Sequence, residues 1–146
     1  MWPQRVDILL VEDDPTEAEL ALAALRERNI FNNVVHVMDG SDALIFISNI
    51  GLFGEGNVGL PRVIFLDLKL KSVSGLDVLR QIKVEDHTKT IPVVVFTSSQ
   101  REIELIESYH LGVNSYVIKP TDFSLYKQVV GEMGHYWVNV NKSPAA

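Results

Sequence analysis

The stretch ILLVEDDP, residues 8–15, decides the fold. Its first four residues are apolar without interruption, which favours a strand covered on both faces. Asp14 can then cap a helix, Pro15 suits the first helical position, and Glu17 has the spacing of a capping box. The chain is therefore predicted to pass from a buried strand directly into a helix, with acids at the junction.

Four more short apolar runs follow and are rich in β-branched residues. We expect each to be a strand buried in the same way. With the first run they are Val6–Val11, Val34–Val37, Val63–Leu66, Pro92–Phe96 and Ser115–Ile118.

Helical patterns separate and follow these runs. After the first helix, we expect helices to begin near Ser41, at Ser74 and after Pro120. Ser99 and Glu102 have capping-box spacing and predict a further helix that ends near Gly112. The last helix is predicted to run from about residue 122 to residue 137.

Five alternating β and α segments predict a parallel sheet with helices on both faces. We expect one domain over residues 1–146, with a core of about residues 6–138 and a frayed tail over 139–146. Residues 51–61 contain four glycines and predict a long surface loop. Tyr136 and Trp137 could pack on the core or form a dimer contact.

Composition narrows the possible functions. The net charge of −6 disfavours non-specific binding to nucleic acid. The absence of cysteine excludes disulfides, thiolate zinc sites and cysteine nucleophiles. No signal peptide and no apolar run long enough to cross a bilayer are evident, so a cytoplasmic location is expected. Four scattered histidines lack metal-ligand spacing and are expected to be structural: His36, His87, His110 and His135.

Polar residues stand where the strands end. Glu12 and Asp13 follow the first strand and Asp67 follows the third, while Thr97 and Lys119 end the fourth and fifth. Ligands of such sheets bind beyond the carboxyl ends of the strands. Clustered carboxylates repel one another, and Mg²⁺ prefers oxygen ligands of this kind. We therefore expect a site where Mg²⁺ assists transfer of a phosphoryl group.

The chain resembles the response-regulator receiver domains of two-component signalling over nearly its whole length. The matching pieces are 8–15, 65–68, 74–75, 96–98 and 116–120. The resemblance implies a flavodoxin-like three-layer (βα)5 sandwich with strand order 2-1-3-4-5. It also implies a signalling switch rather than an enzyme, acting as a stand-alone response regulator without direct DNA binding and dephosphorylating itself.

The resemblance also implies roles for individual residues. Asp67 would accept a phosphoryl group from a phosphohistidine of a sensor kinase. Glu12, Asp13, Asp67 and the main-chain carbonyl of Lys69 would hold Mg²⁺, with Glu12 acting through water. Thr97 and Lys119 would sense the phosphoryl group.

The expected switch couples the site to a distant surface. Tyr116 would turn inward when Thr97 moves, and the Lys119–Pro120 bond would be cis. The readout surface would be the fourth helix, fifth strand and fifth helix. The long loop and the aromatic end of the last helix resemble small receivers that partner bacterial phytochrome-type kinases.

Some residues depart from the family pattern, and the lifetime of the phosphoryl group stays open. Lys71 replaces the usual proline four residues after the acceptor, and Lys69 and Ser99 occupy positions that tune dephosphorylation. Three alternatives remain: a phosphatase or mutase with an aspartyl-phosphate, a flavodoxin-like cofactor carrier, and a receiver that only binds proteins. The first lacks a second Asp two residues after Asp67, and the second lacks a phosphate loop after the first strand.

Overall fold

The protein was analysed as a computed structural model that describes residues 5–31, 33–49 and 59–144. Five parallel strands form one sheet in the order β2-β1-β3-β4-β5. The strands are β1 (Ile8–Val11), β2 (Val34–Val37), β3 (Val63–Leu66), β4 (Val93–Thr97) and β5 (Ser115–Ile118). The predicted parallel sheet and strand order are therefore confirmed.

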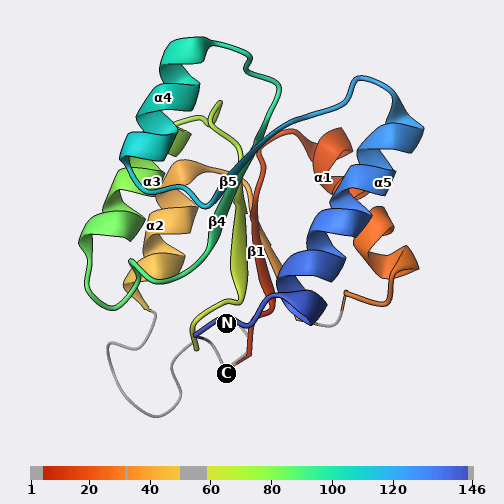
Figure 1. The fold of residues 1–146 in the computed structure, drawn as a ribbon, viewed down its shortest axis with the longest axis horizontal. Helices are drawn as coiled ribbons and strands as arrows, with labels where there is room; N and C mark the ends of the chain where they lie inside the picture. The colour runs from red at the N-terminus through yellow and green to blue at the C-terminus, as the bar shows by residue number, and fades with distance from the viewer. Residues whose placement is uncertain (1–4, 32, 50–58, 145–146) are drawn as a thin grey trace.

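Helices cover both faces of this sheet (Figure 1). They are α1 (Pro15–Glu27), α2 (Gly40–Ser48), α3 (Gly75–Val84), α4 (Glu102–His110) and α5 (Phe123–Gly134). Helices α1 and α5 lie side by side on one face, and α2, α3 and α4 lie on the other. Of the helices that the structure describes, none has the length and apolar character needed to span a membrane.

Alternation along the strands divides the core in two. Successive side chains of a strand point to opposite faces of the sheet. Leu9 and Val11 of β1 accordingly join the core under α2 and α3, whereas Ile8 and Leu10 join the core under α1 and α5. Every residue of β1, β3 and β4 is buried, and all of these residues except Thr97 are apolar.

The predicted cap at Asp14 and the predicted helix start at Ser74 are both confirmed. The Asp14 carboxylate accepts hydrogen bonds from the amides of Thr16 and Glu17 at the start of α1. The Ser74 hydroxyl accepts one from the amide of Asp77 at the start of α3. Each bond satisfies a backbone donor that has no partner inside the helix.

The predicted start of α4 is wrong. The helix begins at Glu102 after an N-cap, Arg101, that makes no side-chain capping bond. The Ser99 hydroxyl instead hydrogen-bonds the carboxylate of Glu104, so it does not close a capping box with Glu102. The predicted end near Gly112 is confirmed, because Gly112 has a φ of 97° just beyond the C-cap.

The end of the chain also differs from expectation. Helical turns continue past α5 as a wider π-helix over His135–Val140, and Ser143 is buried, so the tail is not frayed over its described residues. Trp137 packs against the α1–α5 core, which explains this continuation. The Lys119–Pro120 bond is not cis, since no cis peptide bond occurs in the described ranges. The predicted loop over 51–61 lies mostly outside the described residues.

Candidate phosphoacceptor and metal site

Three acids meet beyond the carboxyl ends of β1 and β3. These strands are neighbours in register, with Val11 opposite Leu66, so the residues that follow them emerge together. Carboxylate oxygens of Glu12, Asp13 and Asp67 all lie within 4.8 Å of one another. Glu12 and Asp67 are buried, and Asp13 is partly exposed. The predicted meeting of these carboxylates is confirmed.

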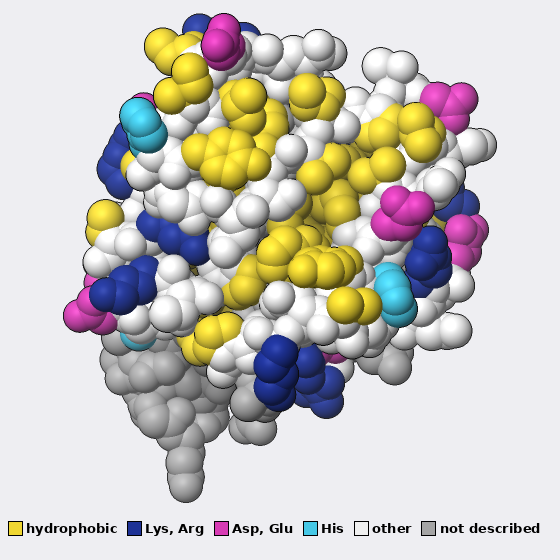
Figure 2. All heavy atoms as spheres, in the orientation of Figure 1, with side chains coloured by type: hydrophobic (Ala, Val, Ile, Leu, Met, Phe, Trp, Pro, Cys, Tyr) yellow, Lys and Arg dark blue, Asp and Glu magenta, His cyan; other side chains and the backbone are white. Residues whose placement is uncertain are grey.

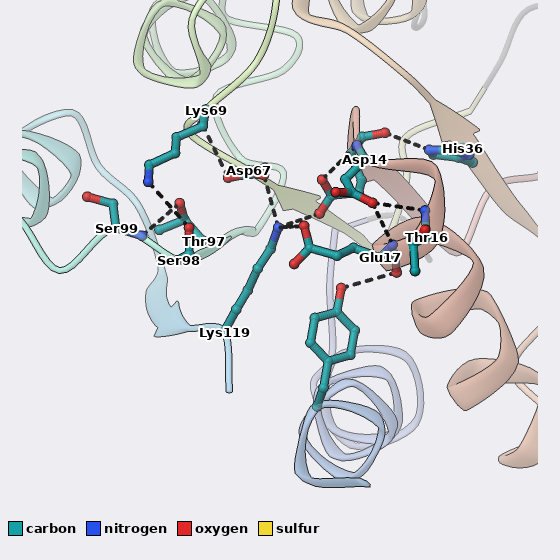
Figure 3. Close-up of polar contacts among 12 residues, drawn as sticks. Asp14, Thr16, Glu17, His36, Asp67, Lys69, Thr97, Ser98, Ser99 and Lys119 are labelled. Atoms are coloured by element: carbon teal, nitrogen blue, oxygen red, sulfur yellow. Dashed lines mark hydrogen bonds and ion pairs between the residues drawn. The ribbon is translucent and has the colours of Figure 1, made fainter. Parts of the chain in front are cut away.

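Lys119 reaches into this cluster from the end of β5 (Figure 3). Its Nζ lies 2.6 Å from Oε1 of Glu12 and 3.0 Å from Oδ2 of Asp67, and its side chain is 4% exposed. It also lies 3.2 Å from Oε2 of Glu17, a side chain at the mouth of the site. One buried ammonium is thus shared among three carboxylates.

Charge and burial oppose each other at this cluster. Burial disfavours the charged form of Lys119, but Asp67 and Glu12 together outweigh it and raise the pKa of the ammonium. Burial raises the pKa of Glu12 to about 7, because the hydrogen bond from Lys119 offsets only part of the desolvation. A single lysine therefore does not neutralise the acids of the site.

Thr97 ends β4 and is fully buried. Its hydroxyl oxygen accepts a hydrogen bond from the amide of Ser99 at 3.3 Å, which fixes it in the turn after the strand. The next residue, Ser98, accepts a hydrogen bond at 3.4 Å from Nζ of Lys69. Thr97 is therefore held at the same edge of the sheet as Asp67, and Lys69 bridges the two strand ends.

Lys69 also orients the acid that precedes it. Its amide donates a hydrogen bond at 3.2 Å to Oδ1 of Asp67, while Lys119 takes Oδ2. Both carboxylate oxygens of Asp67 consequently have a donor. Lys71, at the departure from the family pattern, is exposed and lies next to Ser72, whose φ of 62° is left-handed.

The start of α3 holds the backbone of Asp67 closely. The Gly75 amide donates to the carbonyl oxygen of Leu68 at 3.0 Å, and a Cβ at position 75 would collide with the carbonyl oxygen of Asp67. Only glycine permits this approach. The Ser74-Gly75 pair therefore positions the strand end that carries the acid.

Tyr116 is half-buried on β5, and its ring packs against the core under α2 and α3. Its hydroxyl donates a hydrogen bond at 3.1 Å to the carbonyl oxygen of Ser99. Burial raises the pKa of Tyr116. The side chain thus already contacts the turn that contains Thr97.

The sequence did not single out three residues of the site. Glu17 was interpreted only as half of a capping box, yet its carboxylate pairs with Lys119. The Tyr126 hydroxyl of α5 donates to the carbonyl oxygen of Glu17, and His36 contacts the carbonyl oxygen of Glu12 at 2.8 Å. The position of Glu17 three residues after Asp14 is compatible with a capping box and does not reveal the ion pair with Lys119, which only the fold shows.

The site fits a divalent cation. It offers three converging carboxylates on adjacent elements, which is a ligand set that hard cations prefer. Their combined negative charge exceeds the positive charge of Lys119, and burial makes the uncompensated charge more costly. A metal here would relieve repulsion that the side chains leave uncompensated.

Comparisons with known proteins agree with this geometry. The family model for the response regulator receiver domain matches residues 8–130. The probable methanogenesis regulatory protein FilR2 of Methanothrix harundinacea is 39% identical over 137 residues, covering 94% of this chain and 86% of that protein. Response regulator Rcp1 of Synechocystis is 36% identical over 140 residues, covering 95% and 93%.

Solved structures extend the likeness to the fold. The phosphorylated cyanobacterial phytochrome response regulator RcpA has a TM-score of 0.86 at 33% identity, covering 96% of this chain and 99% of that one. The Mn²⁺-bound form of Rcp1 has a TM-score of 0.85 at 33% identity, covering 98% and 100%.

The chain belongs to the response regulator receiver domain family. It is a signalling protein of two-component systems, in which an aspartate accepts a phosphoryl group and a divalent metal is bound. Within the family it is similar over nearly its whole length to the response regulator Rcp1 and to the cyanobacterial phytochrome response regulator RcpA.

Proposed function

We propose that Asp67 is the phosphoryl acceptor of this receiver and that Mg²⁺ is its metal. The observation that carries the proposal is the ion pair of Asp67 with Lys119 and the convergence of its carboxylate with those of Glu12 and Asp13 at one edge of the sheet. Glu12, Asp13, Asp67 and the main-chain carbonyl of Lys69 form the proposed ligand set. When bound, the cation supplies positive charge that offsets the charge of the phosphoryl oxygens.

The proposed reaction is an in-line transfer. A carboxylate oxygen of Asp67 forms a bond to phosphorus, the bond from phosphorus to the kinase histidine breaks, and the imidazole leaves with the electron pair. Lys119 then pairs with one phosphoryl oxygen, and the Thr97 hydroxyl donates to another. Hydrolysis of the acyl phosphate by water returns Asp67, so the protein dephosphorylates itself.

The proposed output is a shift in population. Movement of Thr97 toward the phosphoryl group draws the Ser99 turn with it, and the Tyr116 side chain can then turn inward. The readout surface is α4, β5 and α5. In support, Figure 2 shows hydrophobic side chains gathered over this face, and exposed apolar residues there include Ile103, Ile106, Tyr109, Ile118 and Phe123.

The proposed donor is a phytochrome-type sensor histidine kinase in the cytoplasm. Support comes from the similarity to Rcp1 and RcpA over nearly all of each chain. Phosphotransfer from a panel of purified histidine kinases tests this. A phytochrome-type kinase should transfer its phosphoryl group fastest, and faster transfer from any kinase of another type would refute the choice of donor.

The acceptor is tested with a small phosphodonor. Incubation with acetyl phosphate and Mg²⁺ should add one phosphoryl group to the intact protein mass, and Asp67→Asn should abolish it while the far-UV circular dichroism is unchanged. Phosphorylation of Asp67→Asn would show that another residue is the acceptor. Labelling that is independent of Mg²⁺ would contradict the proposed role of the metal.

A further inference from the structure

Glu17 provides Lys119 with a carboxylate outside the buried cluster. It lies in the first turn of α1, and its Oε2 is 3.2 Å from Nζ of Lys119. Its side chain is 36% exposed, whereas those of Glu12 and Asp67 are 3% and 7% exposed. The ammonium is therefore held by two carboxylates inside the site and by one at its mouth (Figure 3).

The backbone of Glu17 is fixed from two sides. Its amide donates to Oδ1 of Asp14 at 3.0 Å, and its carbonyl oxygen accepts from the hydroxyl of Tyr126 at 3.2 Å. Tyr126 in turn packs against Phe96 of β4, with ring centroids 5.2 Å apart. Because the backbone is tied to Asp14 and to Tyr126 of α5, the base of the Glu17 side chain is held beside Lys119 at the rim of the site.

The two buried carboxylates can bind either Lys119 or a divalent cation. Glu12 and Asp67 belong to the triad that would hold the cation, and the same two residues now hold Lys119. A cation that takes their oxygens weakens both ion pairs, and a buried ammonium without a partner is costly. Glu17 is not in the triad, so it can keep its contact with Lys119 when the other two turn to the cation.

We propose that Glu17 is a positioning residue that holds the ammonium of Lys119 at the mouth of the site when a divalent cation occupies Glu12 and Asp67. By keeping a partner for the lysine, it makes metal binding more favourable. This inference rests on the proposed metal site. It concerns the protein before phosphorylation, when no phosphoryl oxygen is present to pair with the ammonium of Lys119.

Affinity for Mg²⁺ provides the first test. Titration of MgCl₂ into ¹⁵N-labelled protein, followed through the amide resonances of Asp14 and Lys69, gives the dissociation constant. Glu17→Gln should weaken binding roughly two- to fivefold, the effect of one partly exposed ion pair. Glu19→Gln is the matched control, because Glu19 lies exposed on the same helix. Equal affinity of Glu17→Gln and wild type would overturn the inference.

A double-mutant cycle separates action through the lysine from direct attraction of the cation. In the Lys119→Met background, Glu17→Gln should no longer weaken binding. An equal loss in both backgrounds would mean that Glu17 attracts the cation directly, which overturns the proposal. Asp13→Asn tests the metal site itself: if it binds Mg²⁺ as tightly as wild type, the proposed ligand set fails rather than the role of Glu17.

The NMR resonance of the Lys119 side-chain nitrogen reports on the pairing of the ammonium separately from any change in the fold. In Mg²⁺-saturated wild type, the ¹⁵Nζ resonance should stay visible because the ammonium remains paired and protected from exchange. In Mg²⁺-saturated Glu17→Gln it should broaden or disappear, although amide spectra show an intact fold. A resonance that is equally protected in the variant would contradict the proposal, even if Lys119→Met fails to fold.

Discussion

The ammonium of Lys119 lies 3.0 Å from Oδ2 of Asp67, although the two residues are separated by 52 positions in the chain. Both side chains are buried, and Glu12 shares the same ammonium at 2.6 Å. The contact exists because β3 and β5 flank β4 in one parallel sheet and end at the same edge. It holds the positively charged ammonium of Lys119 against the carboxylate that we propose to be phosphorylated.

Removal of the Lys119 ammonium should destabilise the metal-free protein. Lys119→Met leaves Glu12 and Asp67 buried without their partner, which should lower the free energy of unfolding by about 3 kcal/mol. Urea denaturation measures this, and millimolar MgCl₂ should restore more stability to the variant than to wild type.

The control for that loss is Lys127→Met. Lys127 pairs with Glu27 at the surface, so its removal should cost less than about 1 kcal/mol. If both lysine variants lose the same stability, or if Mg²⁺ restores nothing to Lys119→Met, the buried cluster does not have the energetics described.

The stabilisation by Mg²⁺ should depend on pH through Glu12. Burial raises the pKa of this carboxyl from 4.5 to about 7, so the folded metal-free protein binds a proton more tightly than the unfolded chain does. The contribution of protonated Glu12 to the stability of the metal-free protein is therefore lost as the pH rises from 4.5 through about 7. A cation binds the ionised form, so the rise in Tm on adding Mg²⁺ should grow between about pH 5.5 and about pH 7.5.

Thermal melts with and without MgCl₂ across this range measure the effect. Glu12→Gln cannot ionise and should show a flatter dependence. A rise in Tm that is independent of pH in the wild type, or an equal slope in Glu12→Gln, would argue against Glu12 as the titrating group.

Thr97 should be needed for the response rather than for phosphorylation. Its hydroxyl accepts from the Ser99 amide, and the Ser99 carbonyl oxygen accepts from Tyr116, so Thr97 and Tyr116 contact one turn. Thr97→Ala should still be phosphorylated by acetyl phosphate, but the amide shifts of α4 and β5 should change much less on phosphorylation. Removing the buried acceptor should also cost about 1 kcal/mol of stability.

Thr97→Ser keeps the hydroxyl and serves as the control. It should retain most of the phosphorylation-induced shift changes. Changes of wild-type size in Thr97→Ala would show that the signal reaches the readout surface by another route.

Gly75→Ala should destabilise the fold by about 2 kcal/mol, because the added methyl group forces the backbone of Asp67 away from α3. Gly131→Ala is a useful comparison: its nearest neighbour is the flexible side chain of Arg28, which can move. Gly131→Ala should cost far less or add stability, since alanine favours the helix. Equal losses in the two variants would remove the special role assigned to Gly75.

Much of this arrangement was predictable because the signals are local. The strands 34–37, 63–66 and 115–118 have the predicted bounds, since short and mostly apolar, β-branched runs favour buried strands of this length. The acids and Lys119 could be placed together because parallel strands end at one edge. The proximity of Asp67 to Lys119 and to the other two acids follows from that topology, whereas its hydrogen bond from the Lys69 amide is local.

Apart from the Lys119–Pro120 bond, which is not cis, the incorrect predictions concern side chains with two possible partners. Ser99 has the spacing of a cap but bonds Glu104, and Glu17 has the spacing of a capping box but pairs with Lys119, which is 102 positions away. Spacing alone does not rank a local partner against a distant one. The tail was misjudged for the same reason, because Trp137 packs against a core whose other members lie far away in sequence.

The central claim is that Asp67 carries the phosphoryl group, and chemical mapping of the acyl phosphate tests it most directly. Protein phosphorylated with acetyl phosphate and Mg²⁺ is reduced with borohydride, which converts a phosphorylated aspartate to homoserine, and is then analysed by peptide mass spectrometry. We predict homoserine at position 67 and nowhere else. Homoserine at position 13 or at any other aspartate, with Asp67 unchanged, would contradict the account.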